Sequence, residues 1–200
     1  MMILDLKTRP QAKLKKITEF LARGEVIAYP TETVYGLGCD ATDKRAVEKI
    51  YQIKGRDQNN QLLVLLGSRS MAEKYFIFDK LSRRLAKKYW PGPLSLILPV
   101  RPEYREAFGR EAVGVRLSSN PVATSLSRRL GKPIISTSAN PSGQPAALSG
   151  DQVVAYFADR LDLIAALADA GELEFSSGST IVDATSGQIT IIRQGAISIS

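Results

Sequence analysis

The chain has 200 residues, with 27 Lys and Arg against 20 Asp and Glu, a formal net charge of +7, and no histidine. This length suits one domain with a sizeable core. The missing histidine excludes Ser-His-Asp and Cys-His catalysis and HExxH zinc sites, and the single cysteine, Cys39, excludes cysteine metal clusters and internal disulfides.

Hydrophobic periodicity predicts helices and strands in the first third of the chain. Leu14, Ile17 and Leu21 recur at helical spacing, and Gly24 follows them as a stop signal. Pro30 ends the run of β-forming residues that comes next. The predicted elements are a helix over residues 11–23, strands over 26–29 and 34–37, a helix over 43–53 and a strand over 62–66.

The rest of the chain continues this alternation, with some strands directly adjacent to each other. Asn120 and Pro121 are typical of a helix start, and Gly131 of its end. We therefore predict a single three-layer α/β domain over residues 1–200 with a mixed sheet. The predicted elements are helices near 69–75 and 80–89, a turn at 90–93, strands over 94–100 and 112–117, a helix over 121–130, a strand over 134–137, a helix from 149 to 158, and strands over 180–184 and 188–193.

The cellular location and the class of partner are constrained only loosely. No apolar stretch approaches the roughly 20 residues of a membrane-spanning helix. Asp5 comes too early for the apolar core of a signal peptide. We therefore expect a cytoplasmic protein. The excess of cations suits a polyanion such as nucleotide phosphates or tRNA, but it suits a merely basic surface equally well.

The first polar cluster is PTETVYGLG, residues 30–38, which leaves one predicted strand and enters the next. Gly36 and Gly38 would let the backbone approach a ligand closely. Taken alone, the segment is also compatible with an ordinary turn rich in β-branched residues.

The second cluster is Lys54-Gly55-Arg56. Because Gly55 is expected to stop the preceding helix, we place both cations in an extended segment, where side chains two apart point to the same side. Two converging cations would suit a triphosphate. A basic helix C-terminus, favoured by the helix dipole, is the alternative.

Two further features bring polar or charged groups to strand ends. The strand predicted at residue 134 opens into small and polar residues over 136–145, which offer hydroxyls, an amide and backbone N–H groups to an anion. Arg193 follows a run of β-forming residues, and Arg116 lies within an apolar strand. Each arginine could equally lie on a solvated face or line a polar cavity. Neither a GxxxxGK[ST] loop nor a GxGxxG motif occurs.

In this order and spacing, the clusters resemble the YrdC family, the threonylcarbamoyl-AMP synthases. The resemblance runs from about residue 12 to 197 and suggests the short, single-domain bacterial form. It rests on Pro30–Gly38, Lys54-x-Arg56 (the KxR motif), Trp90–Pro93, Ser138-x-Asn140 (the SxN motif), Ser179–Asp183 and Arg193-x-Gly195.

The resemblance implies a twisted mixed sheet, flanked by helices, around a basic concave pocket. It implies synthesis of threonylcarbamoyl-AMP and pyrophosphate from L-threonine, bicarbonate or CO₂, and ATP with Mg²⁺, for threonylcarbamoyladenosine modification of tRNA. Lys54 and Arg56 would be catalytic. ATP would be bound by Lys54, Arg56, Asn60, Ser138, Asn140 and Arg193, and threonine by Thr33, Tyr35, Arg116, Ser136 and Ser179.

The sequence does not identify metal ligands, although Glu32 is a candidate. The partners implied by the resemblance are the downstream tRNA threonylcarbamoyl transferase complex and, by direct contact, tRNA. A tRNA or double-stranded RNA binding module without catalysis is the alternative from another class, because the net positive charge suits it. A carbamoyl-adenylate enzyme with a different acceptor is a second alternative.

Overall fold

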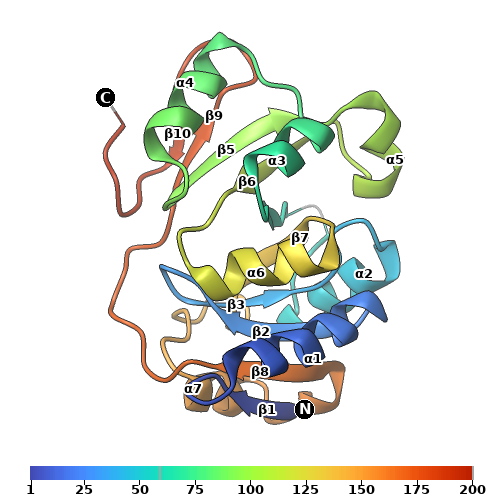
Figure 1. Ribbon diagram of the computed structural model, residues 1–200. Helices are drawn as coiled ribbons and strands as arrows, with labels where there is room; N and C mark the ends of the chain where they lie inside the picture. Colours follow the sequence, from blue (N-terminus) through green and yellow to red (C-terminus); the bar gives the residue numbers. More distant parts are fainter. Residues whose placement is uncertain (59, 200) are drawn as a thin grey trace.

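The computed structural model describes residues 1–58 and 60–199, and these residues form one ten-stranded mixed sheet (Figure 1). Its strand order is β1-β8-β2-β3-β7-β4-β6-β5-β9-β10. The pairs β1–β8, β8–β2, β4–β6 and β5–β9 are parallel, and the other five pairs are antiparallel. The strands are β1 (Met2–Asp5), β2 (Val26–Pro30), β3 (Tyr35–Gly38), β4 (Leu63–Leu65), β5 (Leu94–Pro99), β6 (Ala112–Arg116), β7 (Ile134–Ser138), β8 (Ile164–Asp169), β9 (Thr180–Asp183) and β10 (Thr190–Arg193).

Helix ends follow local capping chemistry. The Asp43 side chain accepts hydrogen bonds from the first backbone N–H groups of α2, and Gly55 ends that helix in the left-handed region with φ 58°. Asn120 caps α6 in the same way, and Gly131 ends it with φ 72°. The α-helices of the described residues are α1 (Pro10–Ala22), α2 (Lys44–Lys54), α3 (Arg69–Tyr75), α4 (Lys80–Tyr89), α5 (Arg105–Phe108), α6 (Pro121–Leu130) and α7 (Gly150–Tyr156).

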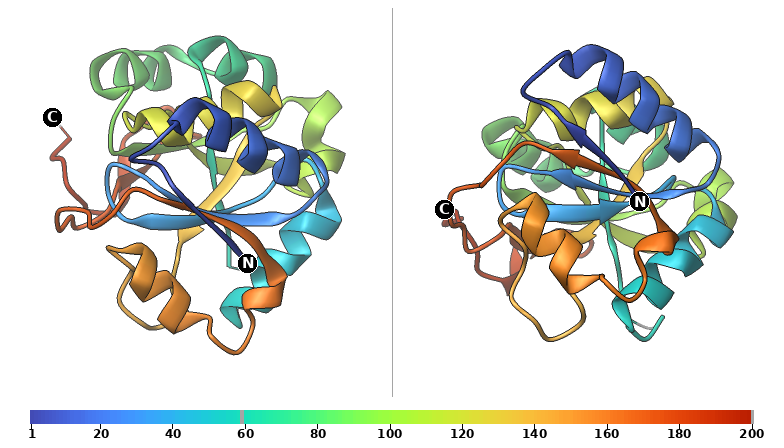
Figure 2. Two further views of the ribbon diagram at one scale, coloured as in Figure 1. Left: turned by 60° about the horizontal axis from the view of Figure 1, so that its bottom comes forward. Right: turned by 90° about the horizontal axis from the view of Figure 1, so that it is seen from below.

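Two layers of apolar side chains sandwich the sheet. On β2, Ile27 and Tyr29 pack with α1 and α6, whereas Val26 and Ala28 belong to the core on the opposite face. Figure 2 shows α1 and α6 side by side on one face, with α2 and α7 across the sheet from them. Ile17 of α1 is fully buried, and such a side chain contributes about 2 kcal/mol of hydrophobic stabilisation.

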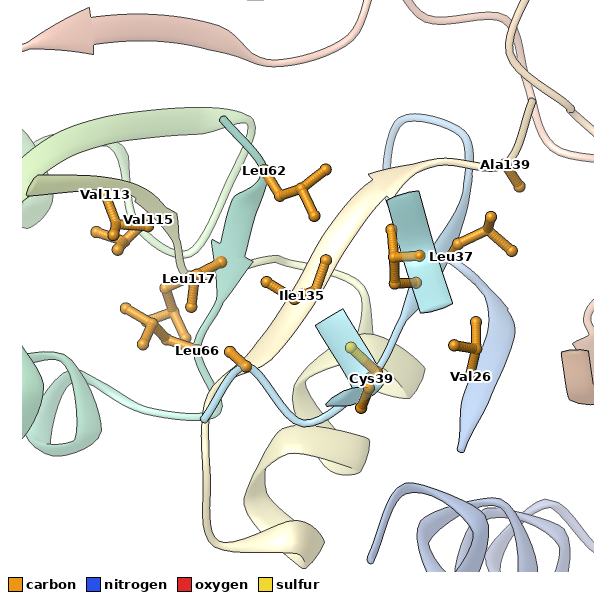
Figure 3. Packing of buried hydrophobic residues seen from close by; sticks show 14 of the residues in the cluster. Val26, Leu37, Cys39, Leu62, Leu66, Val113, Val115, Leu117, Ile135 and Ala139 are labelled. Atoms are coloured by element: carbon orange, nitrogen blue, oxygen red, sulfur yellow. The ribbon is translucent and has the colours of Figure 1, made fainter. Parts of the chain in front are cut away.

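The opposite core runs along most of the sheet. Figure 3 shows Val26 of β2, Leu37 of β3, Ile135 of β7 and Val115 of β6 in the order of their strands across the sheet. These side chains close one face of the central strands. On the other face, Ile134 of β7 joins the apolar layer with α1 and α6, whereas Ser136 and Ser138 of the same strand are polar.

The predicted mixed α/β architecture is confirmed, and the helices at 69–75, 80–89 and 121–130 have their predicted bounds. The strands β1 and β8 and the short helix α5 were not predicted. β8 reads IAALAD, and alanine has little intrinsic preference for strands. β8 becomes a strand because it pairs with β1 on one side and with β2 on the other. No helix within the described residues is both long and apolar enough to cross a membrane.

Candidate active site

A cavity of about 570 Å³ opens on one face of the central strands. Side chains alternate along a strand, so Ser136 and Ser138 of β7 point into it while Ile135 points into the core. Gly114 of β6 lies in the lining and lets Leu63 pack against the strand, because a Cβ there would lie 2.4 Å from the Leu63 side chain. Further walls come from loops at residues 31–34, 140–146 and 176–179, from the segment between α2 and β4, and from β3, β4, β5, β9 and β10.

The cavity carries positive charge. Its lining includes Arg56, Arg116 and Arg193, and no Asp or Glu occurs among the described residues that line it. Hydroxyl and amide side chains make up much of the remaining surface. Guanidinium groups bind carboxylates and phosphates through paired hydrogen bonds. The cavity therefore suits an anionic ligand.

Arg116 is buried and only partly neutralised. Its Nη1 lies 3.5 Å from Oε1 of Glu32 and donates to Thr33 Oγ1 at 3.4 Å. The same Glu32 oxygen has no hydrogen-bond partner among the described residues, and the Ser118 hydroxyl donates to Glu32 Oε2. Glu32 does not line the cavity. Its carboxylate is engaged by Arg116 and Ser118, which does not support its candidacy as a metal ligand.

Arg193 of β10 is exposed and lines the cavity. Its Nε and Nη2 donate to the Ser179 carbonyl at 3.2 and 2.8 Å, and Nη2 also donates to Ser179 Oγ at 3.2 Å. Burial and the positive charge of Arg116 lower the pKa of Arg193 below its usual value. A bound anion would relieve this repulsion between the two guanidinium groups.

Gly195 explains why the arginine motif is Arg-x-Gly. A Cβ at Gly195 would lie 2.4 Å from the backbone carbon of Ser179, so any larger residue would push the two segments apart. The Gly195 N–H also donates to Thr180 Oγ1 at 3.0 Å. This close packing fixes Arg193 against Ser179.

The expected arrangement of Lys54 and Arg56 is wrong. α2 continues through Lys54, and Gly55 then turns the chain, so the two side chains do not share one side of an extended segment. Arg56 lines the cavity, and its Nη2 donates to the Gln61 carbonyl at 3.4 Å. Lys54 does not line it; its side chain is buried beneath the turn that follows β7.

That turn presents Ser138 and Asn140 to the cavity. Ser138 Oγ donates to Asn140 Oδ1 at 2.5 Å, and Asn140 Nδ2 donates to the Gln144 carbonyl. Lys54 Nζ donates to the Ser138 carbonyl at 2.6 Å, to the Asn140 carbonyl at 2.8 Å and to Asn140 Oδ1 at 3.1 Å. The turn is thus stabilised by its own hydrogen bonds and by those from Lys54.

Two further predicted site residues do not line the cavity. Tyr35 is fully buried; its hydroxyl donates to the Gly171 carbonyl at 2.7 Å and accepts from the Ala170 N–H at 2.9 Å. The expectation that Tyr35 lines the pocket is therefore wrong, because β3 directs this side chain toward the segment after β8. Asn60 is exposed, and its carbonyl accepts from the Tyr51 hydroxyl at 3.0 Å.

The structure therefore brings most predicted residues together and adds others. Thr33, Arg56, Arg116, Ser136, Ser138, Asn140, Ser179 and Arg193 all line the cavity. Several polar lining residues were not among the predicted site residues. The serines before residue 179 form a polar run directly ahead of a predicted strand, which is a signal that could have identified them. The missed polar residues are Thr31, Gln61, Thr137, Gln144, Ser176 and Ser177.

The sequence and the fold match known proteins over nearly the whole chain. The Sua5/YciO/YrdC family model, described as "Telomere recombination", matches residues 19–195. Proteins named threonylcarbamoyl-AMP synthase are similar to the chain: that of Pyrococcus abyssi is 33% identical and that of Bacillus subtilis 35%, each over 98% of this chain. The chain spans only 58% and 57% of their lengths.

Solved structures give the same result. Pyrococcus abyssi Sua5 complexed with L-threonine superposes with a TM-score of 0.89 and 32% identity over 98% of this chain and 58% of that one. Escherichia coli YciO superposes with a TM-score of 0.82 and 28% identity over 97% of this chain and 94% of that one.

Proposed function

The chain belongs to the Sua5/YciO/YrdC family, and from this premise we propose that it synthesises threonylcarbamoyl-AMP. The substrates are L-threonine, bicarbonate or CO₂, and ATP, and pyrophosphate is the second product. The main support is the cavity, whose described lining includes three arginines and no carboxylate. The names of the relatives and the threonine complex of Pyrococcus abyssi Sua5 support the same function.

The proposed chemistry suits a chain without histidine. The threonine amine forms a carbamate, with loss of water from bicarbonate or of an amine proton when CO₂ reacts. A carbamate oxygen then attacks the α-phosphorus of ATP, the bond from that phosphorus to the bridging oxygen breaks, and pyrophosphate leaves. The carbamate is already an anionic nucleophile, so this step needs no strong general base. The protein has to align two anionic reactants and stabilise charge on the phosphates, which fixed guanidinium groups do well.

Different side chains of the cavity are assigned to different parts of the substrates. We assign the threonine carboxylate to Arg116, with Thr33, Ser136 and Ser179 around it, because these residues line one continuous surface. Arg56 and Arg193 approach the phosphates, and Ser138 and Asn140 complete the ATP site. Arg116 and Arg193 are close enough for the charge of one to lower the pKa of the other, so the two subsites adjoin.

The described residues do not fit a resident metal ion. They contain no group of three or more His, Cys, Asp or Glu placed to hold one, and the described lining of the cavity includes no carboxylate. We therefore propose that Mg²⁺ enters bound to the phosphate oxygens of ATP, as part of the substrate.

The product determines the rest of the proposal. Threonylcarbamoyl-AMP is an activated acyl donor, and we propose that it is passed to the tRNA threonylcarbamoyl transferase complex in the cytoplasm. The single domain over residues 1–200 would carry the synthase activity, and direct tRNA contact would use the basic surface that the net charge of +7 implies.

The test is pyrophosphate release from ATP with Mg²⁺ and bicarbonate, with and without threonine. Other amino acids serve as controls, and mass spectrometry identifies the adenylate. We expect release that requires both threonine and bicarbonate. Folded protein that releases no pyrophosphate, or releases it regardless of threonine, overturns the proposal. Salt-dependent RNA binding without any ATP or threonine effect would then favour the RNA-binding module.

A further inference from the structure

Lys54 uses its ammonium group entirely within the protein. Its side chain is 3% exposed, and Nζ reaches three acceptors at 2.6, 2.8 and 3.1 Å. An ammonium has three hydrogens to donate, so no donor is left for a phosphate. Lys54 is also absent from the residues that line the cavity. A role as a direct ATP ligand does not fit this geometry.

The three acceptors all belong to the turn that presents Ser138 and Asn140. The Lys54 carbonyl, at the end of α2, also accepts from the Ser142 N–H at 3.1 Å. Lys54 thus holds the turn through both its side chain and its backbone. Asn140 Oδ1 accepts from both Lys54 Nζ and Ser138 Oγ, which leaves the Asn140 amide little freedom to rotate.

We propose that Lys54 is a positioning residue, which acts on the substrate only through the conformation of Ser138 and Asn140, and that Arg56 is the cation of this motif that contacts the anionic substrate. The effect on the reaction rests on the proposed synthase function. The control of the turn does not, because its hydrogen bonds join only atoms of the protein.

The charge on Lys54 is part of this role. A neutral amine has only two hydrogens to donate, so deprotonation removes one of the three hydrogen bonds to the turn. Burial, and to a smaller extent the positive charge of Arg56, lower the pKa of Lys54 to about 8. The groups that contact it from β7 and the following turn are uncharged carbonyl oxygens and the Asn140 amide, which favour the ammonium.

The first test is a double-mutant cycle with Lys54→Met and Asn140→Ala. Methionine keeps the length of the aliphatic part of the side chain and removes the charge and the donors. We expect each single variant to lower kcat/KM for ATP by about 10- to 100-fold, because hydrogen bonds to charged groups are strong. If Lys54 acts through Asn140, the double variant is no more than about twofold below the worse single variant.

Arg56→Met supplies the matched control. Arg56 is proposed to contact the substrate itself. The fold-decreases in kcat/KM caused by Arg56→Met and by Asn140→Ala should therefore multiply in the double variant. Circular dichroism and thermal unfolding check that each variant is folded. If the fold-decreases in kcat/KM of Lys54→Met and Asn140→Ala also multiply, Lys54 contacts ATP directly. That result overturns the proposal.

The second test needs no variant and no activity. Nuclear magnetic resonance follows the Asn140 side-chain amide and the Ser142 backbone amide of the unliganded protein from about pH 6.5 to about pH 9.5. We expect both signals to shift together with a midpoint at about pH 8 or above. Chemical shifts that do not change with pH overturn the proposal. A protein that passes this test but releases no pyrophosphate instead contradicts the synthase function.

Discussion

The two sides of the cavity use basic residues in different ways. At the end of α2, Lys54 is fully paired with acceptors of one turn. Across the cavity, Arg116 is held by a 3.5 Å ion pair and Arg193 by one serine, and both line the open space. The first cation stabilises the wall, and the other two are incompletely satisfied and ready for a ligand.

This difference shows that a cation in a functional motif need not touch the substrate. What matters is whether its donors are already used. A saturated ammonium shapes the site, whereas a guanidinium with five N–H donors can pair with the protein and still bind an anion. Mutations can therefore compare residues that stabilise the fold with residues that line the cavity.

The largest effect is expected for Arg116→Met. Removing this guanidinium should lower threonine-dependent pyrophosphate release by about 100-fold or more. It also leaves the largely buried Glu32 without its ion pair, at a cost of about 3–5 kcal/mol in the free energy of unfolding. Pyrophosphate assays and urea denaturation measure the two effects.

Adding Glu32→Gln to Arg116→Met is the control for this prediction. The second change removes the unpaired charge, so stability should return while activity stays low. Recovery of activity in the double variant would show that Arg116 serves only to neutralise Glu32.

A smaller effect is expected for Gly195→Ala. The added Cβ would meet the Ser179 backbone at 2.4 Å, so the strand carrying Arg193 must shift. Overpacking of this kind costs about 1–3 kcal/mol. The displaced arginine should reduce activity by about tenfold.

Gly187→Ala is the matched control for Gly195→Ala. Gly187 has φ 76° and no heavy atom near its virtual Cβ, so the change should cost about 1 kcal/mol of stability and leave activity unchanged. Thermal unfolding and the pyrophosphate assay distinguish the two variants. Equal activity of both would contradict the role given to the Gly195 packing.

Tyr35→Phe should affect stability and spare substrate binding. Its hydroxyl bonds to Gly171 and Ala170, so its loss should cost about 1–2 kcal/mol, whereas KM for threonine should not change. A raised KM for threonine with unchanged stability would show that Tyr35 contributes to threonine binding.

The pH dependence of stability sharpens the same test. Burial raises the pKa of Tyr35 from 10.0 to about 12. The neutral phenol is therefore favoured in the folded state, and its contribution is complete below pH 10 and declines as pH rises toward 12. The stability gap between wild type and Tyr35→Phe should shrink over this window, as urea denaturation at several pH values would measure. A gap that is constant with pH would contradict the assignment.

The smallest effect is expected for Asn60→Ala. The Asn60 side chain is exposed and lies outside the cavity, whereas Gln61 lines it. We expect less than about a threefold change in kcat/KM for ATP, within the range of ordinary surface substitutions. Gln61→Ala is the comparison and should have the larger effect. The reverse order would show that the loop rearranges when ATP binds.

Some elements were predictable because their signals are local. The helix at 121–130 has Asn120, Pro121 and Gly131 at its ends, and these residues act within one turn of the chain. β8 has no such signal: its alanine-rich sequence becomes a strand only through pairing with β1 and β2. Similarly, Gly38 was expected near a ligand, but it accommodates Tyr29 and the Ile135 carbonyl instead.

The sequence alone determined the mixed α/β architecture, the family resemblance and eight of the fourteen described polar or charged residues that line the cavity. Periodicity and ordered motifs are properties of residues close in the chain, so they are readable without a fold. Only the tertiary structure decided which basic side chains are still free to bind. Lys54, Ser138 and Asn140 meet across more than 80 residues, and that meeting, which uses all three Lys54 donors, leaves Arg56 as the one cation of the motif that lines the cavity in the described part of the chain.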